Sequence, residues 1–291
     1  MKRTKSQIVF QIFNTIIILL ILVSIIAPIM HIISVSISNR DEVLGLSIGI
    51  FPKGFSLDAY KEVIEYNLFF TSLKNSLIVT VAYIILGILV NVMCAYALSN
   101  EFYGKKIINY YFILAMYFSG GLIPTYILIT NYLKLYNTYT AMVLPLVVNV
   151  FYIIVIKSQI EAIPKELNEA AIIDGAHEFQ ALFKVVIPII KPTIAAIAMF
   201  LALGMWNMWY QCMLYTNRDN MWTLQYFLRM LVLSKIVGTN TDLSLALRES
   251  DLAPENFQMA AIVLVAAPIV AIYPFVQKYF VKGILVGSVK G

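Results

Sequence analysis

Charged residues are scarce in this sequence. Asp, Glu, Lys and Arg make up 13% of the 291 residues, whereas hydrophobic residues make up 60%. Soluble domains are about a quarter charged and about half apolar, so this composition excludes a large water-soluble core. Six long windows contain no charged residue at all. They lie between Lys5 and Arg40, Lys74 and Glu101, Lys106 and Lys134, Lys134 and Lys157, Lys191 and Arg218, and Glu255 and Lys278.

Cysteine and histidine are almost absent as well. Cys94 and Cys212 have neither disulfide nor metal-ligand spacing, and they lie in or beside apolar windows, as small core residues do. His31 and His177 are far from any ligand pattern. We therefore expect no metal site. No nucleophile and base stand together either, so the sequence offers no catalytic residues and does not indicate an enzyme.

An energy source for transport is also missing. The phosphate-binding loop pattern G-x-x-x-x-G-K followed by Ser or Thr is absent, since residues 283–290 place their glycines and lysine at other spacings. No carboxylate lies in the middle of a long apolar run either. Such a charge costs about 2.5–3.5 kcal/mol to insert and would indicate an ion-coupled carrier. If this chain transports a solute, another protein has to supply the energy.

The charge-free windows are long enough to be membrane spans. At about 1.5 Å of rise per residue, each can cross a hydrocarbon core of about 30 Å. The chain is therefore predicted to be an all-α polytopic membrane protein, one domain over residues 1–291. The first apolar run is too long for a cleaved signal peptide, so we expect a retained helix. The six predicted transmembrane helices cover about 8–33, 70–97, 107–130, 139–157, 192–212 and 257–281.

The distribution of basic residues predicts the orientation, because they favour the cytoplasmic side. They lie before the first span, between the second and third, and after the sixth, at Lys2, Arg3, Lys5, Lys105, Lys106, Lys278, Lys282 and Lys290. Both termini are therefore predicted to be cytoplasmic, with connections 34–69 and 213–256 outside and 158–191 inside. Lysines near anionic lipid explain the net charge of +5 better than nucleic-acid binding does.

Two of these connections contain helix signals. In 34–69, Ser56 is expected to cap a short helix that places Leu57, Tyr60 and Ile64 on one face. In 158–191 the pattern is helix, turn, helix, and Gly175 suits a left-handed cap between the two. The second of these helices repeats apolar residues at Phe179, Leu182, Phe183 and Val186. Such a hairpin either docks a protein or rests on the lipid surface, and both interpretations remain open on physical grounds.

The residues of connection 158–191 carry a recognisable motif. Residues 169–171 are Glu-Ala-Ala, Gly175 follows after three more, and residues 185–188 follow after a further nine. This resembles the EAA loop of ABC importer permeases, E-A-A-x3-G-x9-I-x-L-P, with aliphatic exchanges at Val185 and Ile187. The resemblance implies that the loop docks a separate ATP-binding subunit, which favours docking over a lipid contact. The residues implied for docking are Glu169, Ala170, Ala171, Asp174, Gly175 and Pro188.

Further segments are similar to the carbohydrate-importing, maltose-permease-like branch of that family. They are residues 135–138, 163–168, 174–176, 206–207 and 282–291. The resemblance narrows further to permeases that are paired with lipoprotein-type binding proteins for complex oligosaccharides. The segments that resemble theirs are residues 273–280 and connection 213–256. Within the motif we expect Glu169 to be a polar contact or brace, and Gly175 to form a turn in which a Cβ would clash.

The resemblance implies a type I importer permease fold in a bacterial cytoplasmic membrane. It also implies a complex of two permeases, here two different chains, with two ATP-binding subunits and an external solute-binding lipoprotein. ATP and magnesium would bind to the ATPase subunits, so this chain is expected to hold no cofactor. The chain would form half of a pore that imports a sugar. A permease for amino acids or peptides is the alternative, and an ion-coupled secondary carrier is a more distant one.

Four residues of the fifth predicted span are candidate substrate contacts: Trp206, Asn207, Trp209 and Tyr210. Aromatic rings pack against sugar rings, and amides bond to hydroxyl groups, so this combination suits a neutral carbohydrate. The alternative is that the rings belong to an interfacial aromatic belt and that Asn207 makes a hydrogen bond between helices. The residues alone do not decide between these interpretations.

Overall fold

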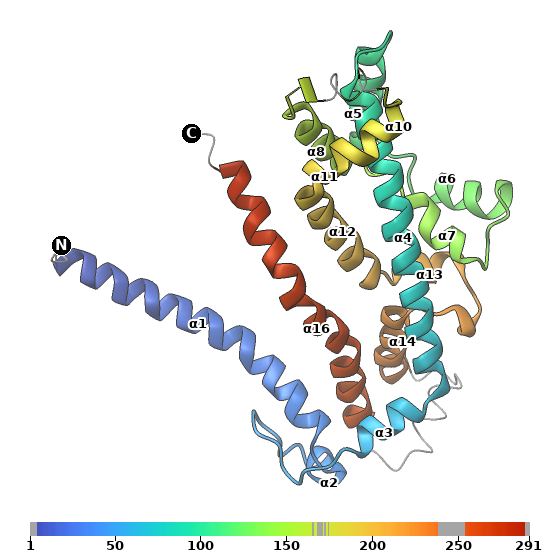
Figure 1. Cartoon of the computed structure of the whole chain (residues 1–291). Coiled ribbons are helices and arrows are strands. Elements are labelled where there is room, and N and C mark those ends of the chain that lie inside the picture. The colour runs from blue at the N-terminus through green and yellow to red at the C-terminus, as the bar shows by residue number, and fades with distance from the viewer. Residues whose placement is uncertain are drawn as a thin grey trace. The chain divides into compact units, whose positions relative to one another are not determined.

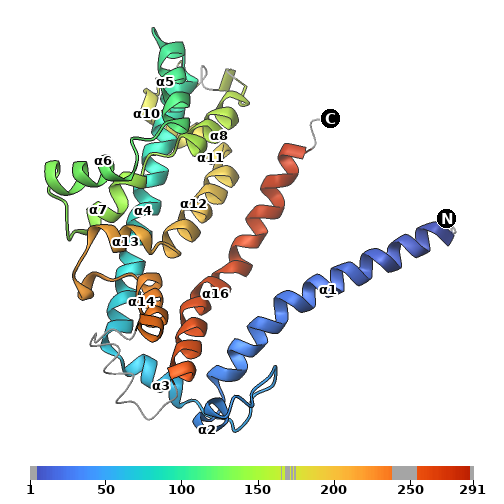
Figure 2. The ribbon, with the colours of Figure 1, turned by 180° about the vertical axis from the view of Figure 1, so that it is seen from behind.

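The computed structural model describes residues 5–288, except residues 165, 168–170, 172, 174 and 238–253. Helices dominate the described chain, in which the isolated β-bridge between Ser38 and Phe55 is the only strand pairing. The chain divides into two compact units, residues 1–69 with 228–268 and residues 70–227 with 269–291. Figures 1 and 2 show the elements from opposite sides.

The helices follow one another with short connections. The first unit contains α1 (Lys5–Ser36), α2 (Arg40–Leu44) and α3 (Asp58–Glu65). The second contains α5 (Lys105–Tyr117), α6 (Leu122–Ile127), η1 (Leu128–Tyr132), α7 (Tyr139–Val143), η2 (Leu144–Leu146), α8 (Val150–Glu161), α10 (Glu178–Ala181), η3 (Leu182–Val186), α11 (Ile187–Ile189), α12 (Lys191–Trp206), α13 (Tyr210–Tyr215) and η4 (Asp219–Met221). Three helices have residues in both: α4 (Asn67–Ser99), α14 (Leu224–Val237) and α16 (Pro254–Ser288).

Three described segments are straight helices long and apolar enough to cross a membrane: Gln7–Ser36, Asn67–Ser99 and Glu255–Ile272. They coincide with the first, second and sixth predicted spans. Three further pairs of helices satisfy the same criteria only together, because each pair is sharply bent. The bends are 107° between Lys105–Tyr117 and Leu122–Tyr132, 51° between Tyr139–Leu146 and Val150–Glu161, and 84° between Glu178–Ile189 and Lys191–Trp206. The structure therefore has three candidate spans, or up to six if each bent pair is one span.

Three of the six spans predicted from the sequence are not continuous helices in the structure. The predicted span at 107–130 is interrupted at residues 118–121, where Gly121 adopts a φ of +85°. The span at 139–157 is interrupted at residues 147–149, directly after the short 3₁₀ turn η2 that contains Pro145. The span at 192–212 ends early, because α12 stops at Trp206 and α13 begins at Tyr210. Charge-free length predicts a crossing but does not predict whether the helix is continuous.

In the first unit, the end of α1 is fixed by an amide from α16. Asn256 is 1% exposed, and its Nδ2 donates to the carbonyl oxygens of Val35 at 3.0 Å and Ser38 at 2.9 Å. The Val35 oxygen also accepts from the Ser38 N–H at 3.3 Å, so the buried amide adds to the hydrogen bonds that end the helix. By contrast, none of the most apolar window of α1 is buried within this chain.

Helix α3 forms where the sequence predicts a short helix, but its cap differs. It begins at Asp58 with Leu57 as the capping residue, and the Ser56 hydroxyl accepts from the Asp58 N–H at 3.1 Å. Its buried residues are Ala59 and Val63, whereas Leu57 and Ile64 are exposed and Tyr60 is half-buried. The Ser56 hydroxyl, and then Lys61, lower the pKa of Asp58.

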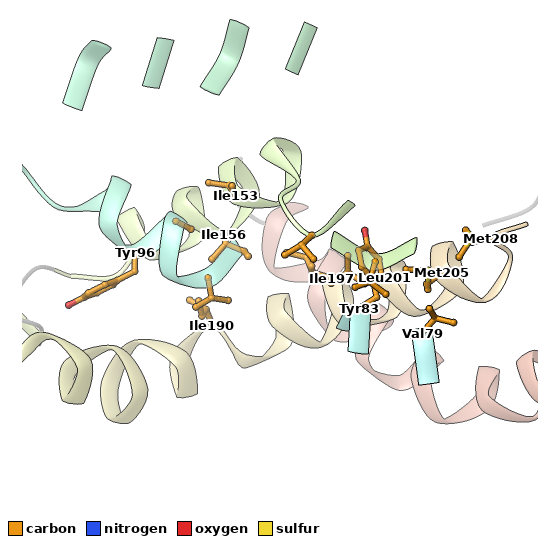
Figure 3. Packing of buried hydrophobic residues seen from close by; sticks show 14 of the residues in the cluster. Val79, Tyr83, Tyr96, Ile153, Ile156, Ile190, Ile197, Leu201, Met205 and Met208 are labelled. Atoms are coloured by element: carbon orange, nitrogen blue, oxygen red, sulfur yellow. The ribbon is translucent and has the colours of Figure 1, made fainter. Parts of the chain in front are cut away.

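In the second unit, helices α4, α8 and α12 enclose one apolar cluster (Figure 3). Gly87 of α4 shows how close the helices are, because a Cβ there would lie 3.1 Å from Leu201 Cδ1 of α12. Small residues allow this close backbone approach in membrane bundles, where van der Waals packing replaces the hydrophobic effect between helices. The residues labelled in Figure 3 are Val79, Tyr83, Tyr96, Ile153, Ile156, Ile190, Ile197, Leu201, Met205 and Met208.

Within this apolar cluster, Asn91 of α4 supplies the hydrogen bonds that the break before α8 lacks. Its side chain is 0% exposed, and its Nδ2 donates to the Val147 oxygen at 2.7 Å and the Gly87 oxygen at 2.5 Å. Its Oδ1 accepts from the Asn149 N–H at 2.8 Å. The Tyr83 hydroxyl donates to the neighbouring Leu146 oxygen at 3.2 Å. A bend in a bundle with so little water requires such partners.

A second asparagine of α4, Asn75, forms hydrogen bonds with the segment of chain that precedes α14. Asn75 is 2% exposed, and its Nδ2 donates to the carbonyl oxygens of Asn220 and Trp222, each at 2.9 Å. Its Oδ1 accepts from the Tyr139 hydroxyl at 2.7 Å. The two asparagines therefore attach three non-adjacent parts of the second unit to one straight helix.

We expect Asn91→Leu to destabilise the protein, because it leaves the Val147 carbonyl and the Asn149 N–H buried without partners. The expected loss is about 2 kcal/mol, seen as a fall of about 5 °C in the apparent melting temperature of the detergent-solubilised protein. Asn131→Leu is the control, because Asn131 is exposed. Equal melting temperatures for the two variants would show that the break does not depend on Asn91.

Candidate docking loop and the break after helix α12

Connection 158–191 contains the turn that the sequence predicts. Residues 171 and 173 are helical, and Gly175 follows with a φ of +87°. The Ala176 N–H donates to the Ala171 oxygen at 3.0 Å. This bond and the left-handed glycine form the Schellman motif that commonly ends a helix. The predicted cap at Gly175 is confirmed.

The reason for this glycine lies in its own backbone and not in its neighbours. Among the described residues, no atom lies within 4 Å of the position that a Cβ on Gly175 would occupy. Glycine is required there by its backbone conformation, because L residues with a side chain are strained at this φ, and not by lack of space. Of the other predicted docking residues, Ala171 is half-buried and Pro188 is exposed in α11, while Glu169, Ala170 and Asp174 lie outside the described residues.

The second arm of the hairpin is a continuous helical stretch, α10, η3 and α11, in which η3 is π-helical. Its apolar residues were predicted to share one face, but they divide into two edges. Leu182 and Val186 are buried in the cluster of the second unit. Phe179 and Phe183 point outward, with 59% and 51% of their surface exposed. The arm therefore has an apolar edge that packs against its own unit and an aromatic edge that does not.

Two contacts connect the hairpin to α4 and α5. The Tyr96 hydroxyl of α4 donates to Glu178 Oε2, in the first residue of α10, at 2.6 Å. Lys105, at the start of α5, lies 3.0 Å from Glu101 and 3.9 Å from Glu161, the last residue of α8. Exposed ion pairs contribute little stability, so the Tyr96 contact is the stronger of the two. Sequence patterns did not indicate the contacts of Tyr96 with Glu178 or of Lys105 with Glu161, because these partners are far apart in the chain.

A cavity of about 420 Å³ lies at the base of the hairpin. It is lined by Tyr96, Ser99, Asn100, Glu101, Lys105, Ile160, Glu161, Ile163, Pro164 and Val186. A smaller one of about 180 Å³ lies on another side of Tyr96, lined by Met93, Tyr96, Ala97, Glu178, Phe179 and Leu182. In the described part of the chain, no three His, Cys, Asp or Glu side chains lie close enough together to hold a metal ion.

The candidate substrate residues gather at the break after α12. Trp206 ends α12, Asn207 and Trp209 are the two caps of the break, and Tyr210 begins α13. Trp206 is buried, with 6% exposed, and its indole N–H has no hydrogen-bond partner among the described residues. Asn207 and Tyr210 are exposed, and Trp209 is half-buried. The structure thus brings the four together but gives them different surroundings.

Asn207 also has a partner that the sequence did not reveal. Gln225 Nε2 of α14 donates to Asn207 Oδ1 at 3.3 Å, and Asn207 Nδ2 donates to the Leu203 oxygen at 2.9 Å. The two amides therefore lie side by side, although 18 residues separate them. No local pattern could have indicated this pair, because the intervening turn determines it.

Residues 78–286 match the model of the family described as binding-protein-dependent transport system inner membrane component. The chain belongs to this family. It is therefore an inner-membrane permease subunit of a transport system, and its all-helical fold is that of an ABC importer permease. The matched region contains the hairpin, the bent spans and the break after α12.

Relatives of this permease cover almost its whole length. Protein LplC of Bacillus subtilis is 37% identical over 100% of this chain and 98% of its own. The polygalacturonan/rhamnogalacturonan transport system permease protein YtcP of the same organism is 35% identical over 91% of this chain and 92% of its own. A chain of a bacterial ABC transporter that imports the acidic polysaccharide alginate superposes with a TM-score of 0.89 at 29% identity, covering 96% of this permease and 99% of that chain.

The conformational requirement at Gly175 predicts how substitutions will behave. Gly175→Val should loosen the hairpin, because a β-branched residue in the left-handed region costs about 1–2 kcal/mol. Gly175→Asn should be tolerated, since asparagine adopts this region more readily and the space is open. Limited proteolysis of membrane vesicles would show faster cleavage within 158–191 for Gly175→Val alone.

Gly49→Val is the matched control, because Gly49 has open space around its Cβ position and no left-handed φ. If the Gly175→Asn and Gly175→Val variants were cleaved equally fast, the left-handed conformation would not be what requires glycine at this position.

Proposed function

We propose that this permease forms half of the translocation pore of an ATP-driven carbohydrate importer and docks an ATP-binding subunit through connection 158–191. The observation that carries the proposal is the hairpin itself. Its turn is fixed by Gly175, and its second arm is held to the chain by Leu182 and Val186 while Phe179 and Phe183 remain exposed. An exposed aromatic edge on a rigid element is suited to a protein groove.

The proposed assembly contains a second permease of different sequence, two ATP-binding subunits and an external solute-binding lipoprotein. The need for ATPase subunits follows from the lack of any phosphate-binding loop in this chain. The family description supports an external binding protein, because it names a binding-protein-dependent system. ATP and magnesium would bind to the ATPase subunits, and this chain would contribute no cofactor.

The proposed topology has six spans and cytoplasmic termini in one domain over residues 1–291. It treats each of the three bent helix pairs as one crossing, which the match to an importer permease over nearly the whole chain supports. Connection 158–191 then faces the cytoplasm, where ATP-binding subunits act. The basic residues around connection 101–106 support the same side.

In the proposed mechanism, closure of the ATP-binding subunits displaces the hairpin, and the displacement tilts the bent spans from an inward-open to an outward-open pore. Transporters of this kind move preformed segments as largely rigid bodies. Asn91 supports rigid movement, because it ties the start of α8 to α4 at the bend. We expect docking through the motif residues Glu169, Ala170, Ala171, Asp174, Gly175 and Pro188.

Carbohydrate is the proposed cargo because relatives whose names give a substrate transport carbohydrates. YtcP is named for polygalacturonan and rhamnogalacturonan, and the solved transporter imports alginate. We propose that this permease takes an oligosaccharide. An amino acid or peptide permease would share the docking loop but lacks such support. An ion-coupled carrier is disfavoured because the predicted spans contain no charged residue well inside them.

The proposed substrate contacts are Asn207, Trp209 and Tyr210, together with Gln225. Trp206 is more suited to a supporting role, since it is buried and truncating it would cost about 3–5 kcal/mol of stability. The amides of Asn207 and Gln225 offer both donors and acceptors to sugar hydroxyl groups. The rings of Trp209 and Tyr210, with centroids 5.6 Å apart and nearly perpendicular, offer an apolar surface.

Docking is tested by the double variant Phe179→Ser/Phe183→Ser. Losing two exposed aromatic anchors should weaken association with the ATP-binding subunit by about 30-fold and reduce ATP-driven uptake, with no change in the amount of permease in the membrane. The measurement is copurification of the subunits encoded beside this chain. Tyr103→Ser is the control, because Tyr103 is a fully exposed aromatic residue outside the hairpin. Unchanged copurification of the double variant would refute docking through this edge.

The cargo proposal is tested with Asn207→Ala and Gln225→Ala in the reconstituted transporter. Uptake is measured with the oligosaccharide that its external binding protein retains. We expect KM to rise about fivefold or more, because hydroxyl partners are lost, while the ATP hydrolysed per sugar stays the same. Asn131→Ala serves as the control. A binding protein that retained an amino acid instead would contradict carbohydrate import, and unchanged KM values would remove the two amides from the path.

A further inference from the structure

The second arm of the hairpin is joined to α4 by a short, charge-assisted hydrogen bond. The Tyr96 hydroxyl donates to Glu178 Oε2 at 2.6 Å, and the tyrosine is only 7% exposed. Bonds to an ionised acceptor are about twice as strong as neutral ones and depend on direction. Glu178 is the first residue of α10, three positions beyond the turn at Gly175. The bond therefore connects α4 to the hairpin close to its tip.

The surroundings of Tyr96 make this a discrete point of attachment. Cavities of about 420 Å³ and about 180 Å³ both include Tyr96 in their walls. The arm also contacts its unit through the apolar residues Leu182 and Val186. Apolar side chains can slide past one another at little cost, whereas a hydrogen bond fixes two atoms.

Helix α4 connects this point to the rest of the pore-forming segments. It is continuous from Asn67 to Ser99, without a break. From Tyr96 it leads back to Asn91, which holds the start of α8, and further to Asn75, which holds the chain before α14. A displacement of Glu178 that pulls on Tyr96 thus reaches both places through one straight helix.

We propose that Tyr96 is a positioning residue for coupling. Its hydroxyl holds Glu178 so that movement of the docked hairpin is passed to α4, and through Asn91 to the start of α8. The inference rests on the proposed docking of an ATP-binding subunit at connection 158–191. It goes further because it assigns the transmission of movement to one side-chain contact outside the docking motif.

The first test is Tyr96→Phe, which removes one oxygen atom and leaves the ring in place. In the complete transporter reconstituted in vesicles, we expect the ATP hydrolysed per sugar imported to rise at least about fivefold, within the range of typical coupling between sites. Assembly of the complex should be unchanged, and its melting temperature should fall by no more than about 5 °C. The matched control is Tyr103→Phe, which removes a hydroxyl from a fully exposed tyrosine.

The acceptor provides a second test. Glu178→Gln keeps a carbonyl oxygen for the Tyr96 hydroxyl, so its coupling ratio should stay close to that of the unmodified protein. Glu178→Ala removes the acceptor and should behave as Tyr96→Phe does. The double variant Tyr96→Phe/Glu178→Ala should be no worse than either single variant, because both remove the same interaction.

A Tyr96→Phe transporter with an unchanged coupling ratio would overturn the inference, as would additive effects of the two substitutions. Parallel losses of assembly, hydrolysis and uptake would also overturn it, since they indicate a purely structural role. These results are distinguishable from failure of the proposed docking. In that case Phe179→Ser/Phe183→Ser would leave subunit association intact, whatever the Tyr96 variants do.

Discussion

A broken helix inside a membrane bundle must find hydrogen-bond partners within the protein, because no water is there to supply them. The structure meets this constraint with asparagine side chains. Asn91 satisfies both a carbonyl and an N–H at the bend before α8, and Asn75 satisfies two carbonyls in the turn before α14. In the other unit, Asn256 donates to carbonyls at the end of α1 and just beyond it. The bend before α8 is thereby a defined corner and not a flexible joint.

The defined corner before α8 determines how such a permease can respond to a force on connection 158–191. If the bend between η2 and α8 is held by α4, a push on the hairpin cannot be absorbed by opening that bend. The push has to move α8 and α4 together. The same logic explains the importance of the Schellman turn, because a hairpin that flexes at Gly175 would lose the displacement before it reached Glu178. A stiff turn at Gly175 and a stiff bend before α8 both allow a displacement of the hairpin to be passed on.

Sequence patterns predicted the elements of this fold better than their connections. Charge-free windows located the straight helices α1, α4 and α16, and the glycine pattern located the cap at Gly175. Proline within a predicted span, as at Pro124 and Pro145, favours a kink. The angle of a bend was not predicted, because it depends on partners such as Asn91 and Asn149 that are distant in sequence. The exposed edge of Phe179 and Phe183 was missed for a related reason, since periodicity identifies an apolar stripe but not which side of it a neighbour covers. The pair of Asn207 and Gln225 has no sequence signature at all.

Helix α1 differs from α4 in what its sequence has to specify. Most large side chains of α1 are exposed, and none of its most apolar window is buried within this chain. Helix α4 instead carries buried asparagines, the tyrosine that bonds to Glu178, and a glycine that lets Leu201 pack closely. Within this chain, one apolar residue in α1 is therefore nearly as good as another. During evolution α1 should drift freely among aliphatic residues, while α4 should retain the identity of its polar and small residues for as long as the corners remain in place.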